Sequence, residues 1–176
     1  MPGTTAKDTE PTWSDRFGGK LVLVLLDNKF SPSIKAARSL WGLQRDLVYT
    51  TGACGDRITV PAGFVSDLAS IPRWCWIILP PDGPWAKAAI VHDFLYATSG
   101  SGHWKKRHDG RTRLTPYGRR EADDVFREAL ANRGVDPLRR TILWAAVRLG
   151  GANGWGADDS RQREVTDQDE AFLTEP

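Results

Sequence analysis

The chain is built around the segment Ala88-Ala89-Ile90-Val91-His92-Asp93-Phe94-Leu95-Tyr96. It is apolar apart from one His, one Asp and one Tyr. It follows a rigid connector, Pro80–Pro84, whose last proline suits the first turn of a helix. We therefore expect a helix that begins there and runs to about Thr98. On such a helix His92 and Tyr96 are four residues apart and share one face.

Two more helices are expected after this segment. Residues 119–132 carry apolar side chains at helical spacing, and a Gly follows the expected end of that helix. Pro137 opens a third helix to about Leu149, which Gly150-Gly151 stops. Asp123 is flanked by core positions on the second of these helices, so we expect its carboxylate to point inward.

Short strands are expected before the helices, because apolar and β-branched segments alternate with turn residues. The expected strands are Lys20–Leu26, Leu40–Leu43, Asp46–Thr51 and Arg57–Val60. Ser66–Pro72 indicates one capped helical turn. Strands followed by helices predict an α+β fold, a small antiparallel β-sheet followed by a three-helix unit that contains the His-Asp helix.

The length of 176 residues, with 40% hydrophobic and 26% charged residues, fits one α+β domain, which we place at 17–156. Residues 1–16 are polar and 157–176 are acidic, so both ends are expected to be disordered. There is no signal peptide pattern and no apolar run of about twenty residues for a transmembrane segment. The two cysteines, Cys54 and Cys75, can pair or stay reduced.

The net charge of +2 hides an asymmetry along the chain. Residues 105–140 hold eleven Lys or Arg against six Asp or Glu, while 158–176 hold seven acidic residues against two Arg. A solvated helix face and a disordered tail account for this pattern. The alternative is that the basic residues 105–140 bind an anionic partner such as lipid headgroups. We do not expect them to bind a specific nucleic acid.

A membrane patch is one of two interpretations of the aromatic segments. The run 74–79 (Trp-Cys-Trp-Ile-Ile-Leu) belongs to the core in one interpretation. In the other it is exposed beside Trp104, Lys105, Lys106 and Arg107, and contacts host membrane phospholipid.

Polar side chains on the expected helices form a candidate site. A single His in an apolar helix is usually a hydrogen-bonded core residue. However, Asp93 and Asp123 are costly to bury unless they are paired or bound to a cation. With the Tyr96 hydroxyl they predict a site in which His92 acts as a base, Asp123 orients it and Asp93 holds a metal. The alternative is a buried structural network that fixes helix packing.

Residues 84–149 resemble the phospholipase A2 superfamily, especially the short forms in parvovirus capsid proteins. Those forms carry Ala-Ala-x-x-His-Asp-x-x-Tyr on one helix and Ala-Asp-x-x-Phe on a second. The matching residues here are Ala88, Ala89, His92, Asp93, Tyr96, Ala122, Asp123 and Phe126.

The phospholipase resemblance implies roles for these residues. His92 would deprotonate a water that attacks a lipid ester carbonyl, and Asp123 would fix the imidazole tautomer. Tyr96 would hydrogen-bond within the carboxylate network, and Asp93 would bind calcium. That superfamily supplies further calcium ligands from a Gly-rich loop before the His, for which the candidates are Pro61–Phe64, with Gly63, and Asp82-Gly83. Asp67 either caps a short turn or reaches the His92 site as a further ligand.

A second resemblance covers residues 18–155. The block Val60–Arg73, the His-Asp-Phe-Leu-Tyr helix and Arg120–Asp123 resemble, in order and spacing, a tailed-phage and prophage family known as domain of unknown function 1353. It implies a phage origin, in the virion or the host cell, and no chemistry. The sequence therefore predicts a phage-encoded hydrolase resembling phospholipase A2. The alternative is a non-enzymatic virion or tail accessory protein that contacts other virion proteins.

Overall fold

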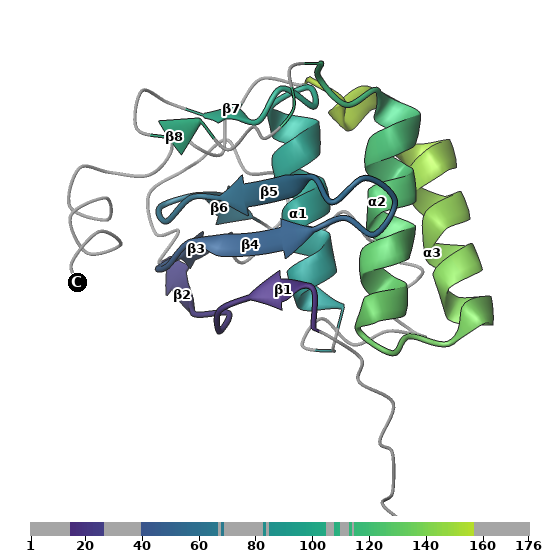
Figure 1. The fold of residues 1–176 in the computed structure, drawn as a ribbon, viewed down its shortest axis with the longest axis horizontal. Coiled ribbons are helices and arrows are strands. Elements are labelled where there is room, and N and C mark those ends of the chain that lie inside the picture. Colours follow the sequence, from purple (N-terminus) through teal and green to yellow (C-terminus); the bar gives the residue numbers. More distant parts are fainter. Residues whose placement is uncertain are drawn as a thin grey trace, which may run out of the picture.

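The computed structural model describes residues 15–26, 40–66, 68, 83, 85–104, 108–109, 113 and 115–156 (Figure 1). Within these residues, short antiparallel strands precede three α-helices, which confirms the expected α+β class. The first sheet has the order β1 (Phe17–Gly18), β4 (Leu47–Thr50), β5 (Arg57–Val60). The second has the order β2 (Leu23–Leu26), β3 (Leu40–Leu43), β6 (Val65–Ser66). A small hairpin joins β7 (His103–Trp104) to β8 (His108–Asp109).

The β4–β5 hairpin forms the sheet face that covers the helices. Leu47 pairs with Val60 and Tyr49 with Ile58, and all four side chains are buried. Since side chains alternate between the two faces of a strand, this register turns one apolar row inward. The inward row packs against α1 (Ala86–Ala97).

The strands differ from the expectation in several places. The strand expected from Lys20 begins only at Leu23, and the short strand β1 was not expected. Ser66 ends strand β6, opposite Trp41 of β3, instead of opening a helical turn. A Ser that precedes Asp is a capping signal, but here pairing with β3 determines its conformation. Residues 67 and 69–72 lie outside the described part of the chain.

The helices stack beside the sheet in the order α1, α2 (Arg119–Asn132), α3 (Pro137–Gly150), and a 3-10 turn, η2 (Gly151–Gly154), follows (Figure 1). Strands β4 and β5 contact α1 on one side and α2 contacts it on another, so α1 is the innermost helix. Residues 88–96 are therefore all buried. A helix enclosed in this way is apolar all round, and any polar group on it needs an internal partner.

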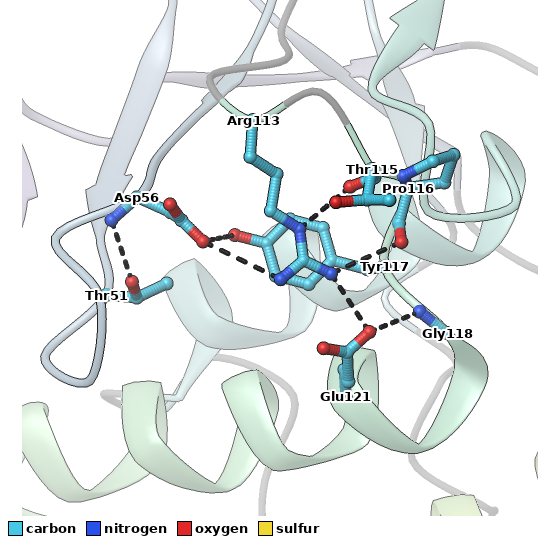
Figure 2. Close-up of polar contacts among 8 residues, drawn as sticks. All are labelled: Thr51, Asp56, Arg113, Thr115, Pro116, Tyr117, Gly118 and Glu121. Atoms are coloured by element: carbon cyan, nitrogen blue, oxygen red, sulfur yellow. Dashed lines mark hydrogen bonds and ion pairs between the residues drawn. The ribbon is translucent and has the colours of Figure 1, made fainter.

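Arg113 fixes the start of α2 (Figure 2). Its guanidinium lies 3.7 Å from the centre of the Tyr117 ring, and its Nη2 donates to Glu121 at 2.9 Å. Glu121 also accepts the backbone N–H of Gly118, which caps the helix. Tyr117 donates its hydroxyl to Asp56 in the β4–β5 turn at 3.0 Å. These contacts tie the first turn of α2, which directly precedes Asp123, to the sheet.

Glu128 makes a second connection between α2 and the first sheet. Its Oε1 accepts from Arg16 at 2.8 Å, from the buried Tyr49 hydroxyl at 2.7 Å and from the backbone N–H of Gly52 at 2.6 Å. The helix is thus held against the sheet at both of its ends.

Candidate functional site

The polar residues expected from α1 and α2 meet in the core. His92 Nε2 lies 2.9 Å from Asp123 Oδ1, and the Tyr96 hydroxyl donates to the same oxygen at 2.7 Å. The imidazole ring packs between Tyr96 and Phe126, with ring centres 4.2 and 4.8 Å apart. The shared helix face of His92 and Tyr96 therefore turns toward α2, where Asp123 meets both side chains.

Arg148 of α3 completes this cluster and was missed by sequence reasoning. Its Nη1 donates to Asp123 Oδ2 at 2.7 Å. Asp123 is 0% exposed, whereas the Arg148 side chain is 27% exposed and reaches the carboxylate from the surface. The pairing depends on how α3 packs on α2, and no local pattern in the sequence encodes that packing. The only signal was that a buried Asp needs a compensating cation.

Asp123 is ionised in this setting. Burial alone would raise the pKa of its carboxyl, but hydrogen bonds from His92, Arg148 and Tyr96 outweigh burial and hold the pKa below its ordinary value. Burial and the neighbouring carboxylate raise the pKa of the Tyr96 hydroxyl, so Tyr96 stays protonated and donates. Asp123 is thus a charged acceptor for all three donors.

His92 is neutral in the same setting. Burial lowers its pKa from the ordinary 6.5, and the opposing attraction of Asp123 does not restore it. Because Asp123 is an ionised acceptor, Nε2 carries the imidazole hydrogen and donates it. Nδ1 therefore holds a lone pair. Among the residues that the structure describes, nothing hydrogen-bonds to this buried nitrogen.

This arrangement is compatible with two roles for His92, one catalytic and one structural. A neutral imidazole with one nitrogen bound to a carboxylate and a lone pair on the other is a general base with a fixed tautomer. The His92 residue is also only 1% exposed, as a purely structural network would be. In a purely structural network nearly every buried polar atom has a hydrogen-bond partner. The unpartnered Nδ1 of His92 therefore favours the general base over the structural network.

Asp93, the neighbour of His92, faces another part of the molecule. It is buried, and its Oδ2 accepts a hydrogen bond from the Ser66 hydroxyl of β6. Ser66 in turn accepts the backbone N–H of Leu68 at 3.0 Å. Asp93 therefore links α1 to the second sheet, on a different side of the helix from Asp123.

Calcium is the metal that the sequence resemblance implied, and it takes six to eight oxygen ligands. Within the described part of the chain, no three His, Cys, Asp or Glu side chains come together to hold a metal. Gly63 lies in the turn before β6 with a φ of 83° and donates its N–H to Leu43 at 2.6 Å. Asp67 lies outside the described residues. Of the three candidate ligands, Asp93 is the one that offers a carboxylate among the described residues.

Several other sequence expectations fall outside the described residues: Lys105, Lys106, Arg107, the run 74–79, Cys75, and the segments 1–14 and 157–176. Trp104 is the last residue of β7. Cys54 is an exposed free thiol. None of the helices in the described ranges has both the length and the hydrophobicity needed to cross a membrane.

Comparisons with known proteins give one match. No curated protein and no solved structure matched the chain. A family model matched residues 41–147, a range that begins within β3 and includes the whole of α1 and α2, with His92 and Asp123. This range is more than half of the chain, so the protein belongs to the family described as "Protein of unknown function (DUF1353)".

Proposed function

We propose that the protein is a hydrolase in which His92 is the general base that activates water. One observation carries the proposal: His92 Nδ1 is buried and without a described partner, while Nε2 is bound to the ionised Asp123. A buried acceptor left without a hydrogen bond costs about 1–3 kcal/mol. A protein that needs the lone pair for chemistry has a reason to bear that cost.

The proposed reaction is the hydrolysis of an ester. His92 Nδ1 takes a proton from water as the water oxygen attacks the ester carbonyl carbon. The resulting tetrahedral intermediate collapses, the carbon–oxygen bond to the alcohol breaks, and the imidazolium returns the proton to the leaving alkoxide. The products are a carboxylic acid and an alcohol. Asp123 holds the tautomer and stabilises the imidazolium between the two proton transfers.

We propose a lipid ester as the substrate and a phage as the origin. The support is the resemblance of residues 84–149 to the phospholipase A2 superfamily and of residues 18–155 to a phage family. The basic segment Trp104, Lys105, Lys106 and Arg107 would suit anionic headgroups of a host membrane. Asp93, Gly63 and Asp67 are the candidate ligands for calcium, and the assay below compares calcium with a chelator.

A second candidate function is a virion or tail accessory protein in which the His92 cluster is structural. The 1% exposure of His92 favours this candidate, since a substrate must reach Nδ1 for any chemistry. The two candidates differ in what the loss of the imidazole removes: activity in the first, and stability alone in the second.

The test is the release of fatty acid from mixed phospholipid vesicles, with calcium or with a chelator. His92→Ala is compared with the wild type and with His103→Ala, a matched control at an exposed position of β7. We expect release by the wild type and by His103→Ala, and none by His92→Ala. No release by the wild type, together with a large fall in melting temperature for His92→Ala, would favour the accessory protein.

A further inference from the structure

We propose that Arg148 is a positioning residue of the site: its guanidinium holds Asp123 Oδ2 so that Oδ1 stays turned toward His92 and Tyr96. The inference deepens the proposed function and rests on it for its catalytic meaning. The contact that carries it is the 2.7 Å hydrogen bond between Arg148 Nη1 and Asp123 Oδ2.

The division of donors between the two carboxylate oxygens makes this contact specific. Oδ1 accepts from His92 and Tyr96, which both lie on α1. Of the donors in the described residues, Arg148 is the one that reaches Oδ2. A buried carboxylate oxygen without a donor is unfavourable. Without Arg148 the carboxylate would therefore rotate to share the α1 donors between both oxygens, and the His92 Nε2–H would lose its fixed acceptor.

Charge leads to the same conclusion. Asp123 is fully buried, and within the described part of the chain Arg148 is the guanidinium that pairs with its carboxylate. A buried charge needs a paired counter-charge. Arg148 supplies that counter-charge at Oδ2, which leaves Oδ1 to accept from the imidazole.

The C-terminal end of α3 is fitted to this position. A Cβ on Gly151 would lie 2.7 Å from the Tyr96 hydroxyl oxygen, so only glycine lets the end of α3 approach this closely. Trp155 then packs edge-on against the Tyr96 ring, with centres 5.1 Å apart. Arg119 of α2 donates to the Arg148 carbonyl at 3.3 Å. These contacts fix the backbone from which Arg148 reaches Asp123.

The test follows the His92 Nε2–H proton directly, by NMR of the nitrogen-15-labelled full chain, with the resonance assigned by its loss in His92→Gln. A buried N–H that donates to a carboxylate resonates downfield and exchanges slowly with water. The variants are Arg148→Gln, the conservative Arg148→Lys, and Arg139→Gln as a control. Arg139 lies on the same helix, is exposed, and pairs with Asp136 at 3.1 Å.

We expect the resonance in the wild type and in Arg139→Gln to coincide. In Arg148→Gln it should move upfield or vanish through exchange, and Arg148→Lys should restore part of it. In the vesicle assay, Arg148→Gln should lower kcat about a hundredfold with KM unchanged, as expected for a misplaced catalytic group.

The NMR result decides the inference independently of activity. A wild-type resonance in Arg148→Gln, or no such resonance in the wild type, would overturn the role of Arg148. If Arg148→Gln does not fold, Arg148→Lys decides: an intermediate shift supports the inference and a wild-type resonance overturns it. A changed resonance in a protein that hydrolyses nothing would instead leave the role of Arg148 in place and remove the proposed hydrolase.

Discussion

At the scale of single residues, the arrangement around Asp123 explains why a charge can stay in the core. The carboxylate of Asp123, on α2, accepts from three side chains on two other helices: His92 and Tyr96 on α1, and Arg148 on α3. The same contacts hold the pKa of Asp123 below its ordinary value although burial raises it. The cluster is thus both a stabilising junction of the helices and the means by which His92 is oriented.

The pKa of His92 is lower in the folded chain than in the unfolded chain, so we predict that the protein loses stability in mild acid. Burial holds the pKa of His92 in the folded chain below 6.5, the ordinary value. As the pH falls through about 6.5, the unfolded chain binds a proton that the folded chain does not, so the free energy of unfolding falls. One such proton contributes at most about 1.4 kcal/mol per pH unit. Asp123 acts in the same direction at lower pH, since its contribution is lost as the pH falls through its lowered folded pKa.

Urea denaturation at about pH 8 and about pH 5.5, on either side of the ordinary His pKa, measures this effect. We expect the wild type to lose more stability between the two pH values than His92→Gln, which has no imidazole to titrate. His103→Gln, which changes an exposed His, should behave as the wild type. Equal losses in the wild type and His92→Gln would show that His92 is not held neutral by burial.

At the scale of elements, periodicity and stop signals located the helices, because apolar spacing and flanking Pro and Gly residues are local properties. The expected helices end within about one residue of α1, α2 and α3. The strand β1 could not be found this way, since two residues are too few to show an alternation. Arg148 could not be found either, because its contact with Asp123 joins positions 25 residues apart through the packing of α3 on α2.

Arg113 offers a test of how α2 is anchored. Arg113→Ala removes the hydrogen bonds to Glu121 and to the backbone carbonyls of Thr115 and Pro116 (Figure 2). Hydrogen bonds contribute about 1 kcal/mol each, and less where water competes, so we expect a loss of about 1–2 kcal/mol in urea denaturation. Arg120→Ala, at an exposed position on the same helix, should cost less than about 0.5 kcal/mol. Equal effects of the two substitutions would mean that Arg113 does not anchor α2.

At the scale of the whole molecule, the innermost position of α1 is what makes the site. The β4–β5 face covers one side of the helix and α2 covers another, so every polar group on α1 must find its partner inside the protein (Figure 1). Asp93 finds Ser66 of the second sheet, and His92 finds Asp123. The sequence predicted the second pairing because both residues lie on apolar helix faces. It did not predict the first, because Ser66 carried a turn signal.

Two adjacent carboxylates on α2 allow a direct measurement of whether Asp123 orients His92 for proton transfer. Asp123→Asn keeps the shape but replaces the ionised acceptor with an amide, whereas Asp124→Asn changes a carboxylate that accepts from Trp144 at 3.0 Å. The measurement is fatty acid release from mixed phospholipid vesicles by folded samples of the wild type and both variants. We expect wild-type release for Asp124→Asn and a fall of about a thousandfold or more for Asp123→Asn, as for a base held in the wrong tautomer. Undiminished release by Asp123→Asn, or equal losses in the two variants, would show that Asp123 does not orient a catalytic His92.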